Sequence, residues 1–323
     1  MSPLLVRAST PADFPGLVEI YNAASPDEPT TLAMQEFRER TRRPELPFGR
    51  LVAEQAGVVI GVGFYMQPEW LEGDHSLFVS VVAHPDARGQ GVGEALYDAL
   101  WTEMQPHRPA KLSTWVREDR PAALRFAASR KFIEVAREQD VELDLARLNV
   151  EQRERSFARA RADGYELKTF AEIVKQIGAD EAWQKYYDLD WDAVRDVPLP
   201  PGETLAVPTL ERYRERAEGN PEFDASLWFV ASKDGELAAL SQLWASPVPG
   251  RFDTGFTGVA RAHRGHRLAW ALKYLALEEA IRRGGRAVRT SNDTLNLPMR
   301  NINIGLGFVP IPAYLIMSLT LQP

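Results

Sequence analysis

The stretch VSVVAHPDARGQGVG, residues 79–93, decides the fold class of this chain of 323 residues. It begins with apolar, β-branched residues typical of a buried strand and ends in three glycines just before an amphipathic helical pattern. Gly89, Gly91 and Gly93 allow the backbone to approach a ligand closely. Because the start of the helix leaves N–H groups unpaired, a strand, a glycine loop and a helix in this order predict a site for a small anion.

Two well-known phosphate-binding loops do not fit this stretch. A dinucleotide-binding loop needs glycine three residues after Gly91, where the chain has Glu94. A Walker A loop needs Lys and Ser or Thr after its last glycine, and the chain has no such string. An anion loop of another type and a tight turn that uses glycine only for its positive φ both remain open.

The stretch has a second copy later in the chain. Residues 255–269, GFTGVARAHRGHRLA, align with residues 79–93 at an offset of 176, and Phe308 aligns with Phe132 at the same offset. A repeat of this length indicates duplication of a whole domain rather than a solenoid. We therefore expect two similar domains, 1–147 and 164–323, joined by a linker helix at 148–163.

Hydrophobic periodicity predicts an α/β fold of the α+β type in each copy. In the first copy we expect strands at 50–53, 58–66, 75–82, 111–116 and 135–145 and helices at 11–21, 31–41, 93–104 and 121–130. In the second we expect strands at 227–232, 237–244, 255–259, 287–290 and 314–321 and helices at 268–282 and 297–304.

The composition excludes several classes of protein. The chain has 45 Asp and Glu against 38 Lys and Arg, a net charge of −7, which argues against a nucleic-acid binder. It has no Cys, so disulfides and thiolate chemistry are excluded, and its five His show no metal-binding spacing. With no apolar run of membrane length and no signal-peptide pattern, we expect a cytoplasmic protein without a membrane partner or a metal site.

The pattern Arg-x-x-Gly-x-Gly after a strand, preceded by VVAHP and followed later by a closing Phe, resembles the acetyl-CoA loop of the GNAT family of N-acetyltransferases. The resemblance covers both copies. It implies two GNAT-like domains, each a mixed, mostly antiparallel sheet flanked by helices. It also implies acetyl-CoA as cofactor and the primary amine of a small molecule or peptide as acceptor, in a monomer or homodimer.

The resemblance assigns the cofactor site residue by residue. In the first copy it implies contacts from Val81, Val82, Arg88, Gly89, Gln90, Gly91, Val92, Gly93 and Glu94. In the second copy it implies contacts from Val259, Arg264, Gly265, His266, Arg267, Leu268 and Ala269. Arg267 replaces Gly91, so its side chain either crowds a phosphate or binds it directly, and we expect the first copy to be the stronger cofactor site.

The chemistry of acetyl transfer needs a base, an oxyanion donor and a proton source. An amine with a pKa of about 10 is neutral in only about one molecule in a thousand at pH 7. Candidate bases are Asp74, His75 and Asp253, each of which also suits a surface position at the start of a strand. The amides of Val82 or Val259 are candidate oxyanion donors.

The tyrosine that commonly protonates the leaving thiolate in the family is absent from both copies. Counted back from the closing Phe, its position is Ala127 in the first copy and Asn303 in the second. Asn292, Asn296 and Asn303 either line a polar substrate cleft or only cap and turn the chain. Two hypotheses follow: an acetyl-CoA-dependent N-acetyltransferase, and an acyl-CoA-binding protein in which one or both domains are catalytically silent.

Overall fold

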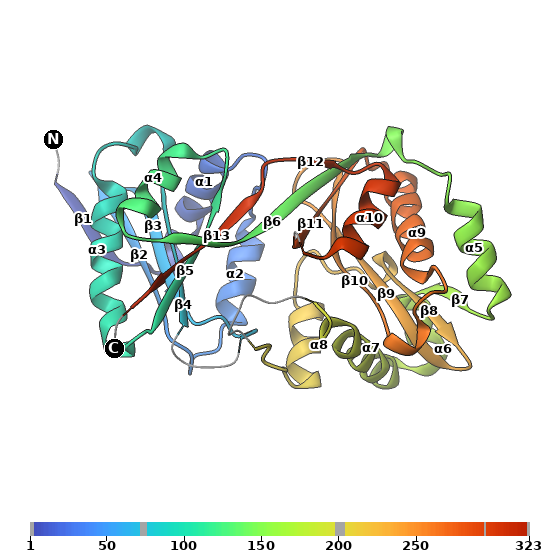
Figure 1. Cartoon of the computed structure of the whole chain (residues 1–323). Helices are drawn as coiled ribbons and strands as arrows, with labels where there is room; N and C mark the ends of the chain where they lie inside the picture. Colours follow the sequence, from blue (N-terminus) through green and yellow to red (C-terminus); the bar gives the residue numbers. More distant parts are fainter. Residues whose placement is uncertain (1–2, 72–75, 198–203, 294, 322–323) are drawn as a thin grey trace. The chain divides into compact units, whose positions relative to one another are not determined.

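The computed structural model describes residues 3–71, 76–197, 204–293 and 295–321 (Figure 1). Contacts within the chain divide it into two compact units. Unit 1 comprises Met1–Arg137, Pro200–Ala206 and Tyr314–Pro323, and unit 2 comprises Glu138–Leu199 and Val207–Ala313. Each unit is a mixed sheet flanked by helices, so the expected fold class is confirmed.

Unit 1 has a sheet in the order β1-β2-β3-β4-β5-β13. Neighbouring strands are antiparallel except for the parallel pair β4 and β5. The strands are β1 (Leu4–Ala8), β2 (Phe48–Gln55), β3 (Val58–Met66), β4 (Ser76–Ala83), β5 (Lys111–Arg117) and β13 (Tyr314–Thr320). The helices are α1 (Phe14–Ala24), α2 (Leu32–Arg40), α3 (Val92–Met104) and α4 (Pro121–Ser129).

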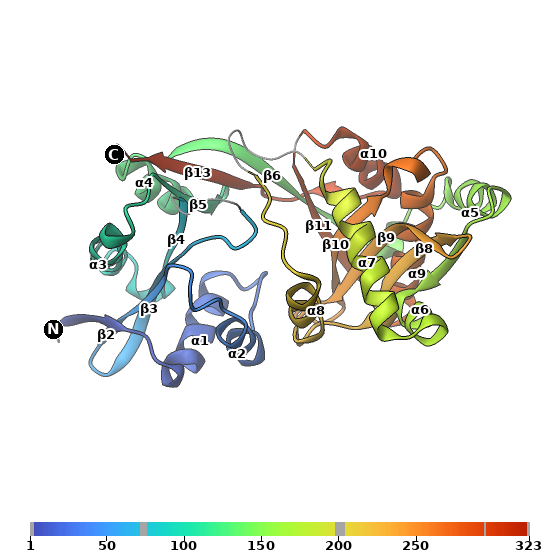
Figure 2. The ribbon, with the colours of Figure 1, turned by 90° about the horizontal axis from the view of Figure 1, so that it is seen from below.

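Alternation along β2 builds a separate core on each face of this sheet. Val52 packs with Leu17 of α1, whereas Leu51 packs with Leu96 and Leu100 of α3. Figures 1 and 2 show the helix pair α1 and α2 on the opposite side of the sheet from α3 and α4. Unit 1 therefore has three layers, and a gap between two of its strands would connect both faces.

Unit 2 repeats this plan with the strand order β7-β8-β9-β10-β11-β6, and β12 pairs with β6. Its parallel pair is β10 and β11. The strands are β6 (Ile133–Asp144, from residue 138 onward), β7 (Glu166–Thr169), β8 (Trp228–Lys233), β9 (Glu236–Ala245), β10 (Arg251–Val259), β11 (Ala287–Asp293) and β12 (Val309–Pro310). The helices are α5 (Arg153–Ala162), α6 (Phe170–Ile177), α7 (Ala179–Val194), α8 (Leu210–Glu218), α9 (Leu268–Arg282) and α10 (Leu297–Leu306).

The same hairpin opens the central part of both sheets. Ala56 and Gly57 between β2 and β3 have φ of 53° and 80°, and Asp234 and Gly235 between β8 and β9 have φ of 53° and 82°. Two consecutive residues with positive φ match the type I′ turn that the twist of a tight hairpin favours. Gly57 and Gly235 thus supply the positive φ of the second turn position in the two copies.

The last strand of each copy is found in the other unit. β13 ends the second copy, yet it pairs along its length with β5 of unit 1, from Tyr314–Arg117 to Thr320–Lys111. β6 ends the first copy, yet residues 138–144 pair with β11 of unit 2. The two units are therefore not contiguous in sequence, unlike the domains 1–147 and 164–323. An alternating pattern predicts that a strand forms but not which edge it joins.

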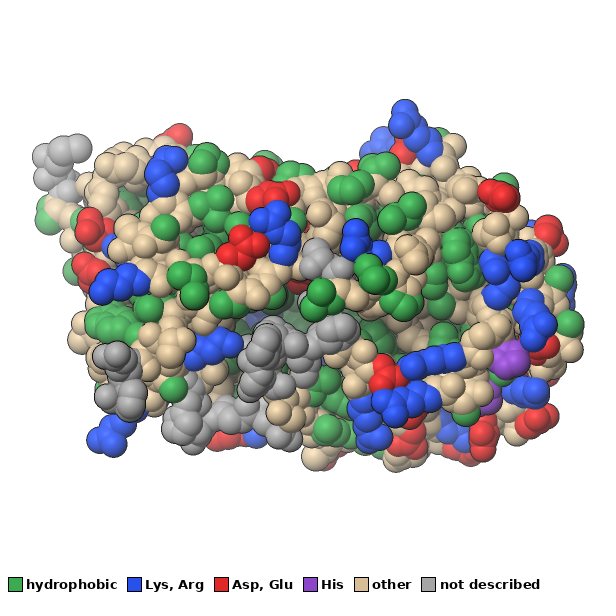
Figure 3. All heavy atoms as spheres, viewed as in Figure 1, with side chains coloured by type: hydrophobic (Ala, Val, Ile, Leu, Met, Phe, Trp, Pro, Cys, Tyr) green, Lys and Arg blue, Asp and Glu red, His purple; other side chains and the backbone are tan. Residues whose placement is uncertain are grey.

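Two further features are the absence of a membrane-spanning helix in the described ranges and the mixed charge of one face. No helix of the described ranges is long and apolar enough to cross a membrane. On the face seen in Figure 3, the side chains of Lys and Arg are intermingled with those of Asp and Glu.

A truncation of Leu315 on β13 tests the strand assignment. Leu315 is 6% exposed and belongs to the core of unit 1, so Leu315→Ala should cost about 2–5 kcal/mol of stability. Hydrogen exchange read by mass spectrometry should speed up in β5 and leave β10 unchanged. The matched variant Leu243→Ala, in the core of unit 2, should show the reverse. Faster exchange in β10 alone after Leu315→Ala would contradict the assignment.

Candidate functional site

The glycine loop of unit 1 presents a row of free backbone donors. Among the described residues, none of the N–H groups of residues 89–94 donates to a protein acceptor, and the first helical bond runs from Ala95 to Gly91. Gly89 and Gly91 have φ of 75° and 81°, and a Cβ on either would meet no atom within 4 Å. The loop is thus open and turns consecutive N–H groups outward, the arrangement that binds an anion.

The strand before this loop leaves its neighbour. β4 pairs with β5 only at residues 76–78 and 111–113, so its second half keeps β3 on one edge and is open on the other. His84 donates its N–H to Ile60 on β3 at 2.9 Å. Since N–H directions alternate along a strand, Val81 and Ala83 point theirs into the opening.

This alternation corrects one expectation about the oxyanion donor. The N–H of Val82 points toward β3, where Val82 pairs with Val62, so the Val82 amide cannot serve the open edge. In unit 2, Ala260 donates to Ala238 at 3.0 Å, which places the N–H of Val259 on the open edge. At the offset of 176, Val259 aligns with the residue after Val82. A shift of one residue along a strand reverses the direction of the amide.

The loop of unit 2 has the same backbone conformation, but its charged side chains bind other groups of the protein. Gly265 repeats the positive φ of Gly89, at 85°. The guanidinium of Arg264, the counterpart of Arg88, forms an ion pair with Asp196, which Arg261 also contacts at 2.9 Å. These two arginines hold the pKa of Asp196 well below its usual range. The cation expected to face a phosphate therefore already has an anionic partner within unit 2.

Arg267 occupies the position of Gly91 in the same left-handed conformation, with φ of 61°. Its side chain turns toward α5, where Nη2 donates to Gln152 at 2.7 Å and Nε contacts Ser156 at 3.3 Å. His266 Nδ1 lies 2.5 Å from the Asp163 carboxylate. The basic side chains of this loop thus bind groups of the protein.

Of the three candidate bases, only one lies in the described ranges. Asp74 and His75 lie outside them. Asp253 lies on β10 at the last rung before β10 and β11 separate, opposite Arg289. Burial raises the pKa of Asp253, whereas its ion pair with Arg251, 3.2 Å between Nε and Oδ1, lowers it.

An aromatic row crosses unit 1 beside the opening between β4 and β5. Ring centroids of Phe64 and Phe78 lie 5.8 Å apart, those of Phe78 and Trp115 lie 6.1 Å apart, and those of Trp115 and Tyr314 lie 6.4 Å apart. The sequence neighbours of Phe64 on β3 and of Phe78 on β4 pack on α3. Because successive residues of a strand point to opposite faces of the sheet, the aromatic row lies on the face covered by α1. Trp115 is 47% exposed, so part of the row reaches solvent.

The row ends in a cluster of charges. Arg117, with a side chain only 9% exposed, forms ion pairs with Asp27, with Glu28 at 3.4 Å and with Asp119 at 3.0 Å. Tyr314 donates its hydroxyl to Glu28, and Arg120 lies 3.6 Å from Asp119. Three carboxylates and two guanidinium groups thus meet at the end of the row.

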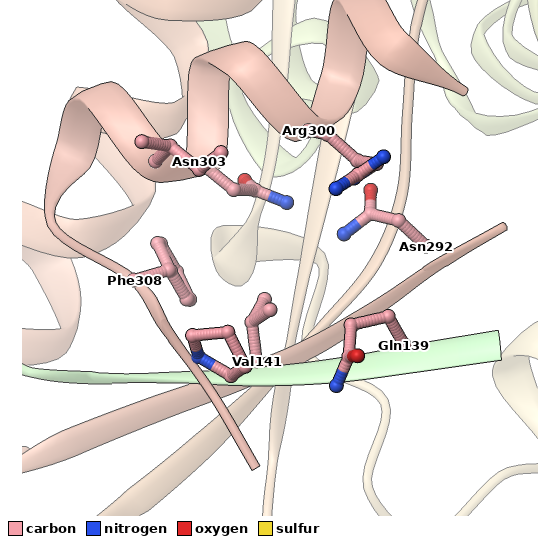
Figure 4. Close-up of a pocket in the computed structure, with 8 residues that line it drawn as sticks. Gln139, Val141, Asn292, Arg300, Asn303 and Phe308 are labelled. Carbon is pink, nitrogen blue, oxygen red and sulfur yellow. The ribbon is translucent and has the colours of Figure 1, made fainter. Parts of the chain in front are cut away.

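The three asparagines expected at a substrate cleft separate into two roles. Asn292 on β11 and Asn303 on α10 line one cavity in unit 2 (Figure 4). Asn296 caps α10 and accepts the N–H of Met299 at 3.3 Å. Asn292 and Asn303 therefore border a cavity, whereas Asn296 caps a helix; a role of the three in substrate binding stays a prediction.

Sequence reasoning missed a buried acid in unit 2. Asp190 on α7 accepts the hydroxyl of Tyr213 at 2.8 Å through Oδ2, while Oδ1 is buried and has no hydrogen-bond partner in the described ranges. Burial raises the pKa of Asp190 to about 6. The sequence feature that could have indicated this acid is its position within the aromatic stretch from Trp183 to Trp191. A carboxyl group among buried rings is desolvated, which raises its pKa.

The described ranges contain no group of three or more His, Asp or Glu side chains that could hold a metal ion.

Comparison with known proteins identifies the family. The acetyltransferase (GNAT) family model matches residues 14–132 and 183–302, one match for each copy. The chain belongs to the GNAT family. The first GNAT match ends at Phe132 and the second before Phe308, so both leave out the strands β6 and β13.

Individual relatives match along the whole chain. Mycothiol acetyltransferase of Corynebacterium aurimucosum is 26% identical over 299 residues, 90% of each protein. A tandem GNAT protein of the clavulanic acid biosynthesis pathway has a TM-score of 0.76 at 22% identity, covering 99% of both chains. A GCN5-related N-acetyltransferase of Sphaerobacter thermophilus has a TM-score of 0.69 at 20% identity. The tandem GNAT architecture is confirmed, and the family supports acyl transfer from an acyl-CoA.

Asp190 gives unit 2 a pH dependence of known sign. An acid whose pKa is raised on folding binds more protons in the native state, so it reduces stability as the pH rises from about 4 to 6. Asp190→Asn should remove this loss, which is on the order of 3 kcal/mol. Urea unfolding of both proteins at several pH values checks it. A difference between them that does not grow across that range would contradict the prediction.

Proposed function

We propose that the chain is an acetyl-CoA-dependent N-acetyltransferase that binds its cofactor in unit 1 and acetylates the primary amine of a small molecule or peptide. The observation that carries the proposal is the open loop of residues 89–94 at the end of a strand with a free edge. Bound acetyl-CoA would supply the thioester and a good leaving group. The protein would supply donors and positioning.

The loop and the strand edge fit the two ends of such a cofactor. The space beside Gly89 and Gly91 leaves room for a phosphate against the free N–H groups. Arg88 is exposed and adds positive charge at the rim, where solvent screens it. The N–H of Val81, directed into the opening, would donate to the oxyanion formed on the thioester carbonyl.

The opposite face of unit 1 supports an amine acceptor. The aromatic row suits a cation that approaches the opening from the face of α1, because aromatic faces attract cations. The relative named mycothiol acetyltransferase supports a small-molecule acceptor, with a peptide as the other option.

The proton route differs from that implied by the family resemblance. Ala127, at the position of the usual tyrosine, is buried and cannot donate a proton, and neither can the carboxamide of Asn303 act as such an acid. The leaving thiolate of unit 1 must therefore take its proton from the amine or from water.

Unit 2 is the weaker candidate for cofactor binding. Its loop side chains are paired with Asp196, Asp163 and α5. Trp270 occupies the position at which unit 1 has the exposed Glu94. Its ring fills the space beside Gly305 of α10, where a Cβ added to Gly305 would lie 2.4 Å from the ring. We propose that unit 2 is catalytically silent, the part of the second hypothesis that these contacts favour.

Replacing Gly91 by Glu tests the cofactor site. A carboxylate in the loop would repel the phosphates and obstruct the free N–H groups. Losing two charge-assisted bonds of about 1.5–3 kcal/mol each should weaken acetyl-CoA binding by two to four orders of magnitude. Isothermal titration calorimetry with acetyl-CoA measures the effect, and acetyl transfer to a panel of amines should fall with it.

The chain offers matched controls for strain and charge. Gly57, Gly265 and Gly235 have φ of 80°, 85° and 82°, and each has open space where a Cβ would stand. Gly57→Glu repeats the strain of Gly91→Glu away from the loop of unit 1, and should keep binding. Gly265→Glu, with Gly235→Glu as its own control, should leave binding unchanged because unit 2 is not the cofactor site. Loss of binding with Gly265→Glu alone would reverse the assignment of the units.

A further inference from the structure

An arginine beside the glycine loop of unit 1 is held against two aromatic rings. Arg130 directly follows α4, and its guanidinium carbon lies 3.8 Å from the ring centroid of Phe126 and 4.8 Å from that of Tyr97. The two rings meet edge to face, 6.1 Å apart, and come from α4 and α3, which lie side by side (Figures 1 and 2). Aromatic faces attract a guanidinium group that stacks on them. The position of this cation is therefore set by the fold before a ligand binds.

The ring of Phe126 connects this arginine to the glycine loop. A Cβ added to Gly93 would lie 3.5 Å from the edge of that ring, which is an ordinary contact distance. Nη2 of Arg130 lies 3.9 Å from Oε1 of Glu94, the residue that follows Gly93. The guanidinium is thus a direct neighbour of the free N–H groups at the start of α3.

The donors of Arg130 are only weakly engaged by the protein. Glu94 is 72% exposed, and the 3.9 Å between the two charged groups is too long for a hydrogen bond. Nη1 donates to the hydroxyl of Ser129 at 3.2 Å, and Nε is buried without a hydrogen-bond partner in the described ranges. Because solvent screens an exposed ion pair, the contact with Glu94 contributes little. The outer edge of the guanidinium therefore still has charge and donors to offer a ligand.

The second copy does not repeat this arrangement. At the offset of 176, the arginine and its two rings are replaced by other side chains: Leu306 for Arg130, Lys273 for Tyr97 and Ile302 for Phe126. Leu306 is fully buried in the core of unit 2. The same pair of helices thus packs without a stacked arginine, so the packing of this fold does not by itself require Arg130.

We infer that Arg130 binds the phosphate group on the 3′-position of the cofactor's ribose. The inference rests on the proposed binding of acetyl-CoA in unit 1. Coenzyme A carries a diphosphate and, a few bonds away on the ribose, a separate phosphate monoester. In that proposal the free N–H groups of residues 89–94 bind the diphosphate, which leaves the monoester to a second cationic group nearby. A guanidinium matches a phosphate well, since two of its N–H groups bind two phosphate oxygens side by side.

The adenine base is the alternative partner for this arginine. Adenine would use the flat face of the guanidinium, and Phe126 already covers one such face at 3.8 Å. A phosphate uses the edge of the group instead. The contact with Glu94 shows that an anionic oxygen approaches Nη2 along this edge. The phosphate is therefore the part of the cofactor that fits Arg130 best, and the arginine makes the site selective for ligands that carry it.

CoA and 3′-dephospho-CoA separate this contact from the rest of the cofactor site. The two ligands share the diphosphate, the adenine and the pantetheine arm, and they differ in one phosphate. Isothermal titration calorimetry on the whole chain should show CoA binding roughly ten- to a hundredfold more tightly, the effect of one charge-assisted contact. The preference should shrink as salt is added, because the side chain of Arg130 is partly exposed.

Variants assign the preference to Arg130. Arg130→Gln should lower the affinity for CoA to that for dephospho-CoA and leave dephospho-CoA binding unchanged, which also reports that the variant is folded. Arg130→Lys keeps the charge but loses the paired N–H groups, so it should retain part of the preference. Arg108→Gln is the matched control, because it removes the same charge from an exposed residue beyond the other end of α3. It should keep the full preference, whereas Gly91→Glu should weaken both ligands alike.

The outcomes distinguish this inference from the proposed function. Equal affinity of the wild type for CoA and dephospho-CoA would overturn the inference and leave the proposed function intact. A loss of affinity for both ligands in Arg130→Gln and Arg130→Lys would also overturn it, because the arginine would then serve a shared part of the cofactor. If the wild type binds neither ligand, the inference and the proposed function are both wrong.

Discussion

The separation of two parallel strands is the constraint on which the site of each unit depends. β4 and β5, and likewise β10 and β11, pair over three residues and then diverge. Beyond that point, alternate residues carry backbone groups that no neighbouring strand satisfies, and unsatisfied backbone groups inside a fold are costly. The glycine loop and the helix start follow directly, so their free N–H groups continue the same path. A single local divergence thereby aligns a strand edge, a loop and a helix N-terminus.

The duplication shows that this backbone conformation persists when the residues of the loop change. Arg267 keeps the left-handed conformation of Gly91, although a side chain in that conformation costs roughly 1–2 kcal/mol. Its hydrogen bonds to Gln152 and Ser156 offset part of this cost. The turn is therefore required for joining strand to helix in both units. Anion binding is a further property, which only an open loop with unoccupied side chains keeps.

Local patterns in the sequence predicted the elements well. Alternation and helical spacing gave the central strands and helices of both copies, and the turn residues Gly57 and Gly235 placed both hairpins. The glycine spacing located the open loop. Short first strands such as β1 and β7 were not predicted, because four or five residues carry too little periodicity to stand out.

The remaining features depend on long-range contacts, which a local pattern does not specify. The partners of β13 and β6 could not be inferred, because any open strand edge offers the same hydrogen bonds. The partner of Arg267 lies 115 residues away along the chain. The pairing of Asn292 with Asn303 around one cavity, and the burial that shifts Asp190, likewise arise only when distant segments pack.

The position of the missing tyrosine shows how the two copies have diverged. Ala127 is 5% exposed and packs among apolar side chains of unit 1, so that helix makes an ordinary core contact. Asn303 at the equivalent position in unit 2 is more deeply buried, yet it faces a void with both polar atoms unpaired. An apolar residue there would relieve the unpaired atoms at no cost in volume, as Ala127 does in unit 1. The unpaired polar groups of unit 1 thus lie in its glycine loop, whereas unit 2, whose loop side chains are paired, has unpaired polar atoms under α10.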